Sequence, residues 1–119
     1  MAAQLAWPDK PVVAFLGDGG FAMCMAELET ARRLNLPLIV VVLCDNALSL
    51  IAMSQERRGL PHHGVDFTNP DIVKVAEAFG ADGKVCETAS EVETAIAAAW
   101  SNRRLTVIQA IVDAGPYRV

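Results

Sequence analysis

Long apolar runs, an excess of basic residues and paired cysteines are all missing from this chain of 119 residues. The longest unbroken apolar run is Leu38–Cys44, whereas a membrane-spanning helix needs about 20 apolar residues. The first residues lack the basic flank and apolar stretch of a signal peptide. The net charge of −4 argues against a nucleic-acid or anionic-membrane surface. The sequence therefore predicts neither a membrane nor a nucleic acid as a partner.

Cysteine is scarce, and its pattern indicates a cellular compartment rather than a catalytic, metal-binding or disulfide role. The three cysteines, Cys24, Cys44 and Cys86, are odd in number, form no CxxC pair and lie in apolar segments. We expect small buried hydrophobic side chains rather than disulfides or metal ligands. Free thiols of this kind are typical of the reducing cytoplasm.

The composition is rich enough in apolar residues to build a core. Hydrophobic residues make up 53% of the chain and charged residues 20%. A chain of this length corresponds to one domain, which we expect to span residues 1–119.

Four segments have the character of buried strands. Two of them are continuous apolar runs rich in Val and Ile, which is typical of parallel strands covered on both faces. The predicted strands are Val12–Leu16, Leu38–Cys44, Lys84–Glu87 and Thr106–Val112.

Helical patterns separate the strands. Asn69 is a possible cap for the third helix, and Ser90 with Glu93 has the spacing of a capping box for the fourth. Gly59 and Gly80 are suited to closing the second and third helices. The predicted helices are Phe21–Leu34, Ala47–Arg58, Pro70–Phe79 and Ser90–Trp100.

This alternation predicts a doubly wound α/β fold, a three-layer α/β/α sandwich with a mostly parallel sheet. The chain opens on Met1–Trp7, which has the character of a helix end, followed by Pro8-Asp9-Lys10-Pro11. Complete doubly wound domains usually open with a strand, so we expect an N-terminally truncated domain, the C-terminal part of a longer chain.

The most informative stretch is Leu16-Gly17-Asp18-Gly19-Gly20-Phe21-Ala22, where a predicted strand passes into a helix. Ligands of α/β sheets bind beyond the carboxyl ends of strands, and glycines there allow close approach of the backbone. The stretch fits the dinucleotide pattern G-x-G-x-x-[G/A], but Asp18 repels a bare phosphate. A bridging Mg²⁺, which favours carboxylates together with phosphates, removes that repulsion.

A second oxygen ligand is expected from the end of the next strand. Asp45 and Asn46 follow that strand directly, so either one is placed to share a metal with Asp18. The backbone carbonyl of Ala47 is a third candidate ligand.

Gly17-Asp18-Gly19 followed by Asp45-Asn46 resembles the GDG…N cofactor motif of thiamine diphosphate-dependent enzymes. The branch it resembles comprises acetolactate synthase and its decarboxylase and carboligase relatives, and the resemblance extends over about residues 1–117. Further agreement lies in Glu27-Leu28-x-Thr30-Ala31, Leu36-Pro37-Leu38, Asp66-Phe67-x-Asn69-Pro70-Asp71 and Ala76-Glu77-Ala78-Phe79-Gly80.

The resemblance implies a role for each matching position. Asp18, Asp45 and the Ala47 carbonyl would ligate Mg²⁺, although Asp45 stands where the family usually has Asn, and Asn46 remains the alternative ligand. The residues expected at the diphosphate of thiamine diphosphate are Gly17, Asp18, Gly19, Gly20, Phe21, Asn46, Leu48 and Ser49.

The same resemblance implies partners. A 2-oxo acid or an aldehyde would be the substrate, and an N-terminal pyrimidine-binding domain of a neighbouring subunit would supply the glutamate that activates the cofactor. That glutamate matches no position of this chain, so we expect a half-site that is inactive in isolation.

Two other functions fit the same fold class. A nicotinamide-dependent dehydrogenase domain would use Asp45 to bind a ribose hydroxyl, but it leaves Asp18 unexplained. A receiver-like regulatory module would need a lysine at a late strand end, and Lys84 is expected to precede its strand.

Two further polar or charged segments, a histidine pair and an arginine pair, have no assigned role in the chemistry. His62 and His63 are expected to be solvated loop residues, with a role near the substrate as the alternative. Arg57 and Arg58 are expected to end a solvated helix, with binding of a substrate carboxylate as the alternative.

Overall fold

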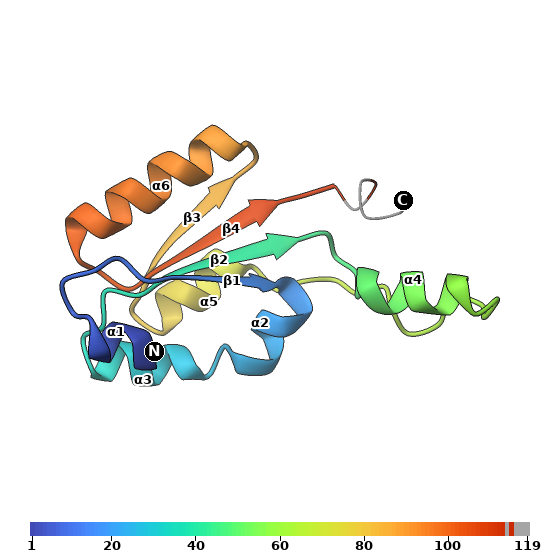
Figure 1. Ribbon diagram of the computed structural model, residues 1–119, viewed down its shortest axis with the longest axis horizontal. Coiled ribbons are helices and arrows are strands. Elements are labelled where there is room, and N and C mark those ends of the chain that lie inside the picture. The colour runs from blue at the N-terminus through green and yellow to red at the C-terminus, as the bar shows by residue number, and fades with distance from the viewer. Residues whose placement is uncertain (114, 116–119) are drawn as a thin grey trace.

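A computed structural model describes residues 1–113 and 115 of the chain, and its centre is a four-stranded sheet. All neighbouring strands pair in parallel, in the order β1-β2-β4-β3 (Figure 1). The parallel sheet is as predicted. The strands are β1 (Val13–Gly17), β2 (Ile39–Cys44), β3 (Asp82–Cys86) and β4 (Thr106–Ile111).

Helices cover both faces of the sheet. In Figure 1, α6 lies over one face, and α2, α3 and α5 lie beneath the other. The core is divided accordingly into two clusters of buried side chains, one on each face. The predicted three-layer sandwich is therefore confirmed. The helices are α1 (Ala2–Ala6), α2 (Asp18–Cys24), α3 (Glu27–Arg33), α4 (Ser49–Arg57), α5 (Ile72–Ala78) and α6 (Ala89–Asn102).

Strand β2 occupies the middle of the core, between β1 and β4. Ile39 and Val41 point to one helical layer and Val42 to the other, and all three are fully buried. Burying an aliphatic side chain of this size contributes about 1.5–3 kcal/mol. The unbroken apolar run thus reflects burial on both faces of the sheet.

The helix predicted over Phe21–Leu34 is divided in two. The chain turns at Met25 and Ala26, where the amides of Leu28 and Glu29 bond carbonyls three residues back. The turn leaves Cys24 exposed, so the prediction of a buried side chain is correct for the other two cysteines and wrong for this one.

Two predicted helix caps are displaced by two residues. Helix α5 is capped by Asp71, whose side chain accepts from the Lys74 amide, and not by Asn69. Helix α6 begins with a capping box of Thr88 and Glu91 in place of Ser90 and Glu93. The closing glycines are as predicted, since Gly59 and Gly80 have φ of 65° and 76°.

Helix α4 projects from the carboxyl edge of the sheet, and the chain after it returns along the same edge (Figure 1). The return is fastened by backbone hydrogen bonds from Leu48 N to Val65 O at 2.7 Å and from Phe67 N to Asn46 O at 3.2 Å. None of the helices within the described ranges combines the length and the apolar character that crossing a membrane requires.

Candidate functional site

The turns that follow β1 and β2 lie side by side at the carboxyl edge of the sheet. Gly17, at the end of β1, is in register with Leu43 of β2. Asp18 opens α2 directly after β1, and Asp45 follows β2 by one residue. The topology therefore brings together the two acidic residues that the sequence predicted at neighbouring strand ends.

A cavity of about 390 Å³ opens between these turns. All but two of the predicted site residues line it. The lining residues are Gly17, Asp18, Gly19, Gly20, Leu43, Asp45, Ala47, Leu48, Ser49, Leu50, Ile51 and Val112.

The two exceptions are Phe21 and Asn46. Phe21 is 3% exposed and belongs to the hydrophobic core, so only its backbone remains available at the turn. Asn46 is exposed and has a left-handed backbone with φ of 59°. This conformation directs its backbone N–H to Asp18.

Three N–H groups converge on the carboxylate of Asp18, which is 3% exposed. Its Oδ1 accepts from the Gly19 amide at 2.8 Å. Its Oδ2 accepts from the Asn46 amide at 2.9 Å and from Asn69 Nδ2 at 2.6 Å. The side chain is therefore held in one orientation by hydrogen bonds from three separate segments.

Asp45 is held by its own turn. Its Oδ1 accepts from the Ala47 amide at 3.1 Å, and its Oδ2 accepts from the Ser49 hydroxyl at 2.5 Å. These bonds fold the chain between β2 and α4 around the carboxylate. They also engage the hydroxyl of Ser49, which was predicted to contact the diphosphate.

The cavity carries negative charge without a compensating cation. Neither Asp18 nor Asp45 takes part in an ion pair in the described part of the chain. Burial of the neighbouring Cys44 thiol, with a smaller contribution from the charges of these two carboxylates, raises its pKa to about 11. Uncompensated carboxylates at a cavity favour a bound cation.

The donor set suits a metal that also takes oxygen ligands from its substrate. Residues 1–113 and 115 contain no cluster of three or more His, Cys, Asp or Glu side chains arranged to hold a metal. Mg²⁺ commonly uses one or two protein carboxylates together with phosphates and water. Two carboxylates and the Ala47 carbonyl therefore fit Mg²⁺ with a phosphorylated ligand better than they fit a closed protein site.

The glycines of the first turn play two different roles. A Cβ atom added at Gly17 or Gly20 would meet no atom within 4 Å, whereas at Gly19 it would collide with Leu48. None of the three has a positive φ, so freedom of the backbone is not the reason for them. Open space beside Gly17 and Gly20 is suited to the close approach of a ligand.

Asn69 is the contact of the candidate site that the sequence predictions missed. It belongs to the Asp66-Phe67-x-Asn69-Pro70-Asp71 motif but was assigned as a helix cap. Its Nδ2 donates to Asp18 Oδ2 and, at 3.0 Å, to Asn46 Oδ1. No local pattern indicates this contact, because Asn69 and Asp18 are 51 residues apart.

The histidine pair lies in the loop after α4, as predicted. His62 Nε2 lies 2.9 Å from Glu56 Oε1, and the backbone of His63 bonds the side chain of Gln55. Arg57 and Arg58 are exposed at the end of α4, also as predicted. These contacts stabilise the projecting loop.

Lys84 corrects one detail of the receiver-like alternative. It lies in the middle of β3 and not before that strand. It is exposed on the outermost strand and lines a groove against α6. It is therefore absent from the acidic edge where a receiver-like site would need it.

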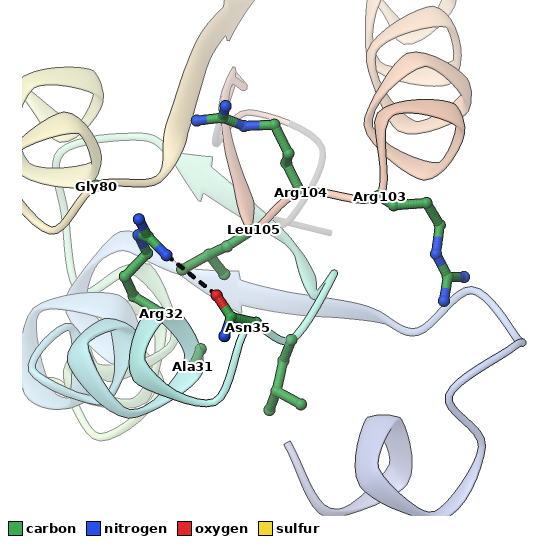
Figure 2. Close-up of a pocket in the computed structure, with 8 residues that line it drawn as sticks. Ala31, Arg32, Asn35, Gly80, Arg103, Arg104 and Leu105 are labelled. Carbon is green, nitrogen blue, oxygen red and sulfur yellow. Dashed lines mark hydrogen bonds between the residues drawn. The ribbon is translucent and has the colours of Figure 1, made fainter.

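A second hollow lies at the opposite, amino edge of the sheet and contains three arginines (Figure 2). Arg32 donates to Asn35, Arg104 pairs with Asp82 at 2.9 Å, and Arg103 donates to the Pro8 carbonyl. Each guanidinium group thus already has a partner within the chain. The acidic cavity at the carboxyl edge remains the candidate site.

Comparisons with known proteins agree with this location. The model of the family "Thiamine pyrophosphate enzyme, C-terminal TPP binding domain" matches residues 1–110. Acetolactate synthase of Bacillus subtilis is 35% identical over 113 residues, which cover 95% of this chain and 20% of that protein. 2-Hydroxyacyl-CoA lyase of Arabidopsis thaliana is 33% identical, over 95% of this chain and 21% of that protein.

Solved structures show the same fold. Benzoylformate decarboxylase from Polynucleobacter necessarius superposes with a TM-score of 0.85 at 27% identity, over 93% of this chain and 21% of that chain. The chain thus spans about a fifth of the length of the relatives it matches. The match decides against the dehydrogenase and receiver-like alternatives. The chain belongs to the family of C-terminal thiamine diphosphate-binding domains of thiamine diphosphate-dependent enzymes.

Proposed function

We propose that this chain anchors the diphosphate of thiamine diphosphate through Mg²⁺ in the cavity between the β1 and β2 turns. The side chains of Asp18 and Asp45 and the carbonyl of Ala47 are the protein ligands. The observation that carries the proposal is a pair of carboxylates at one cavity with no ion pair to neutralise them. The remaining Mg²⁺ ligands would come from phosphate oxygens and water.

Asp45 is a better ligand than the alternative, Asn46. Asp45 lines the cavity together with Asp18, whereas the side-chain oxygen of Asn46 already accepts from Asn69. An anionic ligand also adds attraction for a divalent cation at short range. Asn46 contributes its backbone N–H to Asp18 instead.

The diphosphate is held by the edges of the cavity. Gly17 and Gly20 leave space for it to lie against the backbone. Helix α4 begins at Ser49, and the positive end of a helix favours an anion. The amides of Gly19 and Leu48 are already engaged, with Asp18 and Val65. Gly19 and Leu48 therefore shape the wall of the cavity and do not donate hydrogen bonds to the ligand.

The role of these residues in catalysis is to orient the cofactor. Bound thiamine diphosphate supplies the carbanion and electron-sink chemistry for cleaving or forming carbon–carbon bonds next to a carbonyl. Asp18, Asp45 and the Ala47 carbonyl would hold Mg²⁺ as an anchor for the diphosphate, away from the substrate. The chain's own residues hold the metal, exclude other orientations of the diphosphate and so position the reactive end of the cofactor.

The whole protein would be an acetolactate synthase-like lyase or transferase acting on a 2-oxo acid or an aldehyde. Relatives named as acetolactate synthases and a 2-hydroxyacyl-CoA lyase support this class. A pyrimidine-binding domain, in the same or a separate chain, and a second subunit would complete the site. The isolated chain is therefore inactive, and its three free thiols suit the cytoplasm.

Calorimetric titration of the full-length protein with thiamine diphosphate tests the proposal. Binding is expected with Mg²⁺ and lost in excess chelator. Asp18→Ala is expected to abolish binding, and His63→Ala, on the projecting loop, to leave it unchanged. Equal binding in chelator, or binding that survives Asp18→Ala, contradicts the proposal.

A further inference from the structure

Asn69 is a neutral side chain directed at the buried carboxylate of Asp18. Its Nδ2 group lies between two acceptors, Asp18 Oδ2 at 2.6 Å and Asn46 Oδ1 at 3.0 Å. Since both are oxygen acceptors, only the NH₂ end of the Asn69 amide satisfies them, which fixes the orientation of this side chain. Asn69 thus contacts the carboxylate without lining the cavity itself.

The two carboxylate oxygens of Asp18 differ in how many further partners they can accept. A carboxylate oxygen offers about two lone-pair sites. Oδ2 already accepts two hydrogen bonds, from the Asn46 amide and from Asn69. Oδ1 accepts one, from the Gly19 amide, and keeps a site for another partner. Asp18 therefore offers a metal a single oxygen.

We propose that Asn69 is a positioning residue that restricts Asp18 to monodentate metal ligation and thereby favours Mg²⁺ over Ca²⁺. The inference rests on the proposed function, in which Asp18 is a metal ligand. It adds a determinant of metal selectivity that lies outside the cavity.

The physical basis is the different coordination of the two ions. Mg²⁺ requires six ligands in a near-ideal octahedron at roughly 2.0–2.1 Å, to which each carboxylate usually gives one oxygen. Ca²⁺ takes 6–8 oxygens at roughly 2.3–2.6 Å and accepts bidentate carboxylates readily. Without the Asn69 bond, Oδ2 regains a lone-pair site, and both oxygens of Asp18 become available to a larger ion.

A purely structural role for Asn69 predicts something else. The segment after α4 is already fastened by backbone hydrogen bonds from Leu48 to Val65 and from Phe67 to Asn46. Substitution of Asn69 leaves those bonds in place. If Asn69 only stabilised the fold, its removal would weaken the binding of both ions to the same extent.

The test uses full-length protein and two probes, Mg²⁺ and Ca²⁺, titrated at saturating thiamine diphosphate and followed by calorimetry. Asn69→Ala is expected to shift the ratio of Mg²⁺ to Ca²⁺ affinity toward Ca²⁺ by about tenfold, the scale reported for groups that orient metal ligands. Asn69→Ser, whose shorter side chain does not span both acceptors, gives the same test if the alanine variant fails to fold. Asn102→Ala, at the exposed end of α6, is the matched control and leaves the ratio unchanged.

The outcomes separate this inference from the proposed function. An unchanged ratio in both Asn69 variants, with Asp18→Ala still abolishing binding, overturns the inference alone. Metal-dependent binding that survives Asp18→Ala overturns the proposed function and the inference with it. A shifted ratio with an unaltered control supports both.

Discussion

Gly19 lies so close to Leu48 that a Cβ atom built on Gly19 would stand 2.5 Å from Leu48 Cδ2. The two residues belong to the turns after β1 and β2, which form the two sides of the acidic cavity. Their contact sets how near the two turns approach each other. The close packing of the two turns therefore depends on the absence of a side chain at position 19.

Gly19→Ala is expected to force the two turns apart. Overpacking of this kind costs about 1–3 kcal/mol of unfolding free energy, and the altered spacing should also weaken Mg²⁺-dependent binding of thiamine diphosphate. Urea denaturation and calorimetry measure the two effects. An unchanged unfolding free energy would show that Leu48 yields without cost.

Gly20→Ala is the matched comparison within the same helix. A Cβ atom at Gly20 would meet nothing within 4 Å, and replacing a helical Gly by Ala stabilises by about 0.5–1 kcal/mol. The added methyl group would, however, occupy space proposed for the diphosphate. We expect Gly20→Ala to have an equal or higher unfolding free energy and weaker binding of thiamine diphosphate. Urea denaturation and calorimetry measure the two effects. Cofactor binding at the original affinity would place the diphosphate elsewhere.

Thr88 and Ser90 provide a test of helix capping. Thr88 Oγ1 accepts from the Glu91 amide, and the Glu91 carboxylate accepts from the Thr88 amide in return. Thr88→Ala is expected to lower the unfolding free energy by about 1 kcal/mol. Ser90→Ala, two residues beyond Thr88 in the first turn of α6, should change it little. Denaturation curves showing the larger loss for Ser90→Ala would contradict the observed cap.

These caps show where prediction from the sequence ends. Thr88 with Glu91 and Ser90 with Glu93 have the same spacing of hydroxyl and carboxylate, so a local pattern cannot choose between them. Which pair caps α6 depends on the residue at which β3 ends. The same holds for Asp71 and Asn69, both good cap formers, of which one caps α5 and the other reaches Asp18.

What the sequence did predict depends on local periodicity and on a topological rule. The apolar run in β2 indicated burial on both faces, and neighbouring parallel strands end at one edge. Asp18 and Asp45 were placed together on that basis. The turn at Met25 has no comparable signal, because its residues continue the helical apolar pattern across the break.

Because of Cys44, the stability of the fold is expected to decrease in the alkaline pH range. Burial, together with the charges of Asp18 and Asp45, raises its pKa from 9.0 to about 11. The unfolded thiol ionises first, so the contribution of Cys44 is complete below about pH 9 and is lost as the pH rises toward 11. The unfolding free energy is expected to fall across this window by up to about 1.4 kcal/mol per pH unit.

The control is Cys44→Ala, followed by urea denaturation between pH 7.5 and about pH 10.5. The variant is expected to be less stable at neutral pH because it leaves a small cavity at a buried position. Its loss of stability above pH 9 should be shallower. The unfolding free energy of the variant still depends on pH, since burial also raises the pKa of Cys86. Parallel curves for the two proteins would assign the pH dependence to other groups.

The choice between Asp45 and Asn46 as metal ligand can be made with two variants. Asp45→Ala removes a proposed ligand and should weaken Mg²⁺ binding by at least about 100-fold, the upper end of the losses seen for groups that merely orient ligands. Asn46→Gly removes a side chain but retains the left-handed backbone, with φ of 59°, and the N–H that bonds Asp18. It should bind Mg²⁺ within a few-fold of the unaltered protein, since glycine adopts this φ freely. Titration of Mg²⁺ at saturating thiamine diphosphate measures both, and the reverse order of effects would assign the ligand to Asn46.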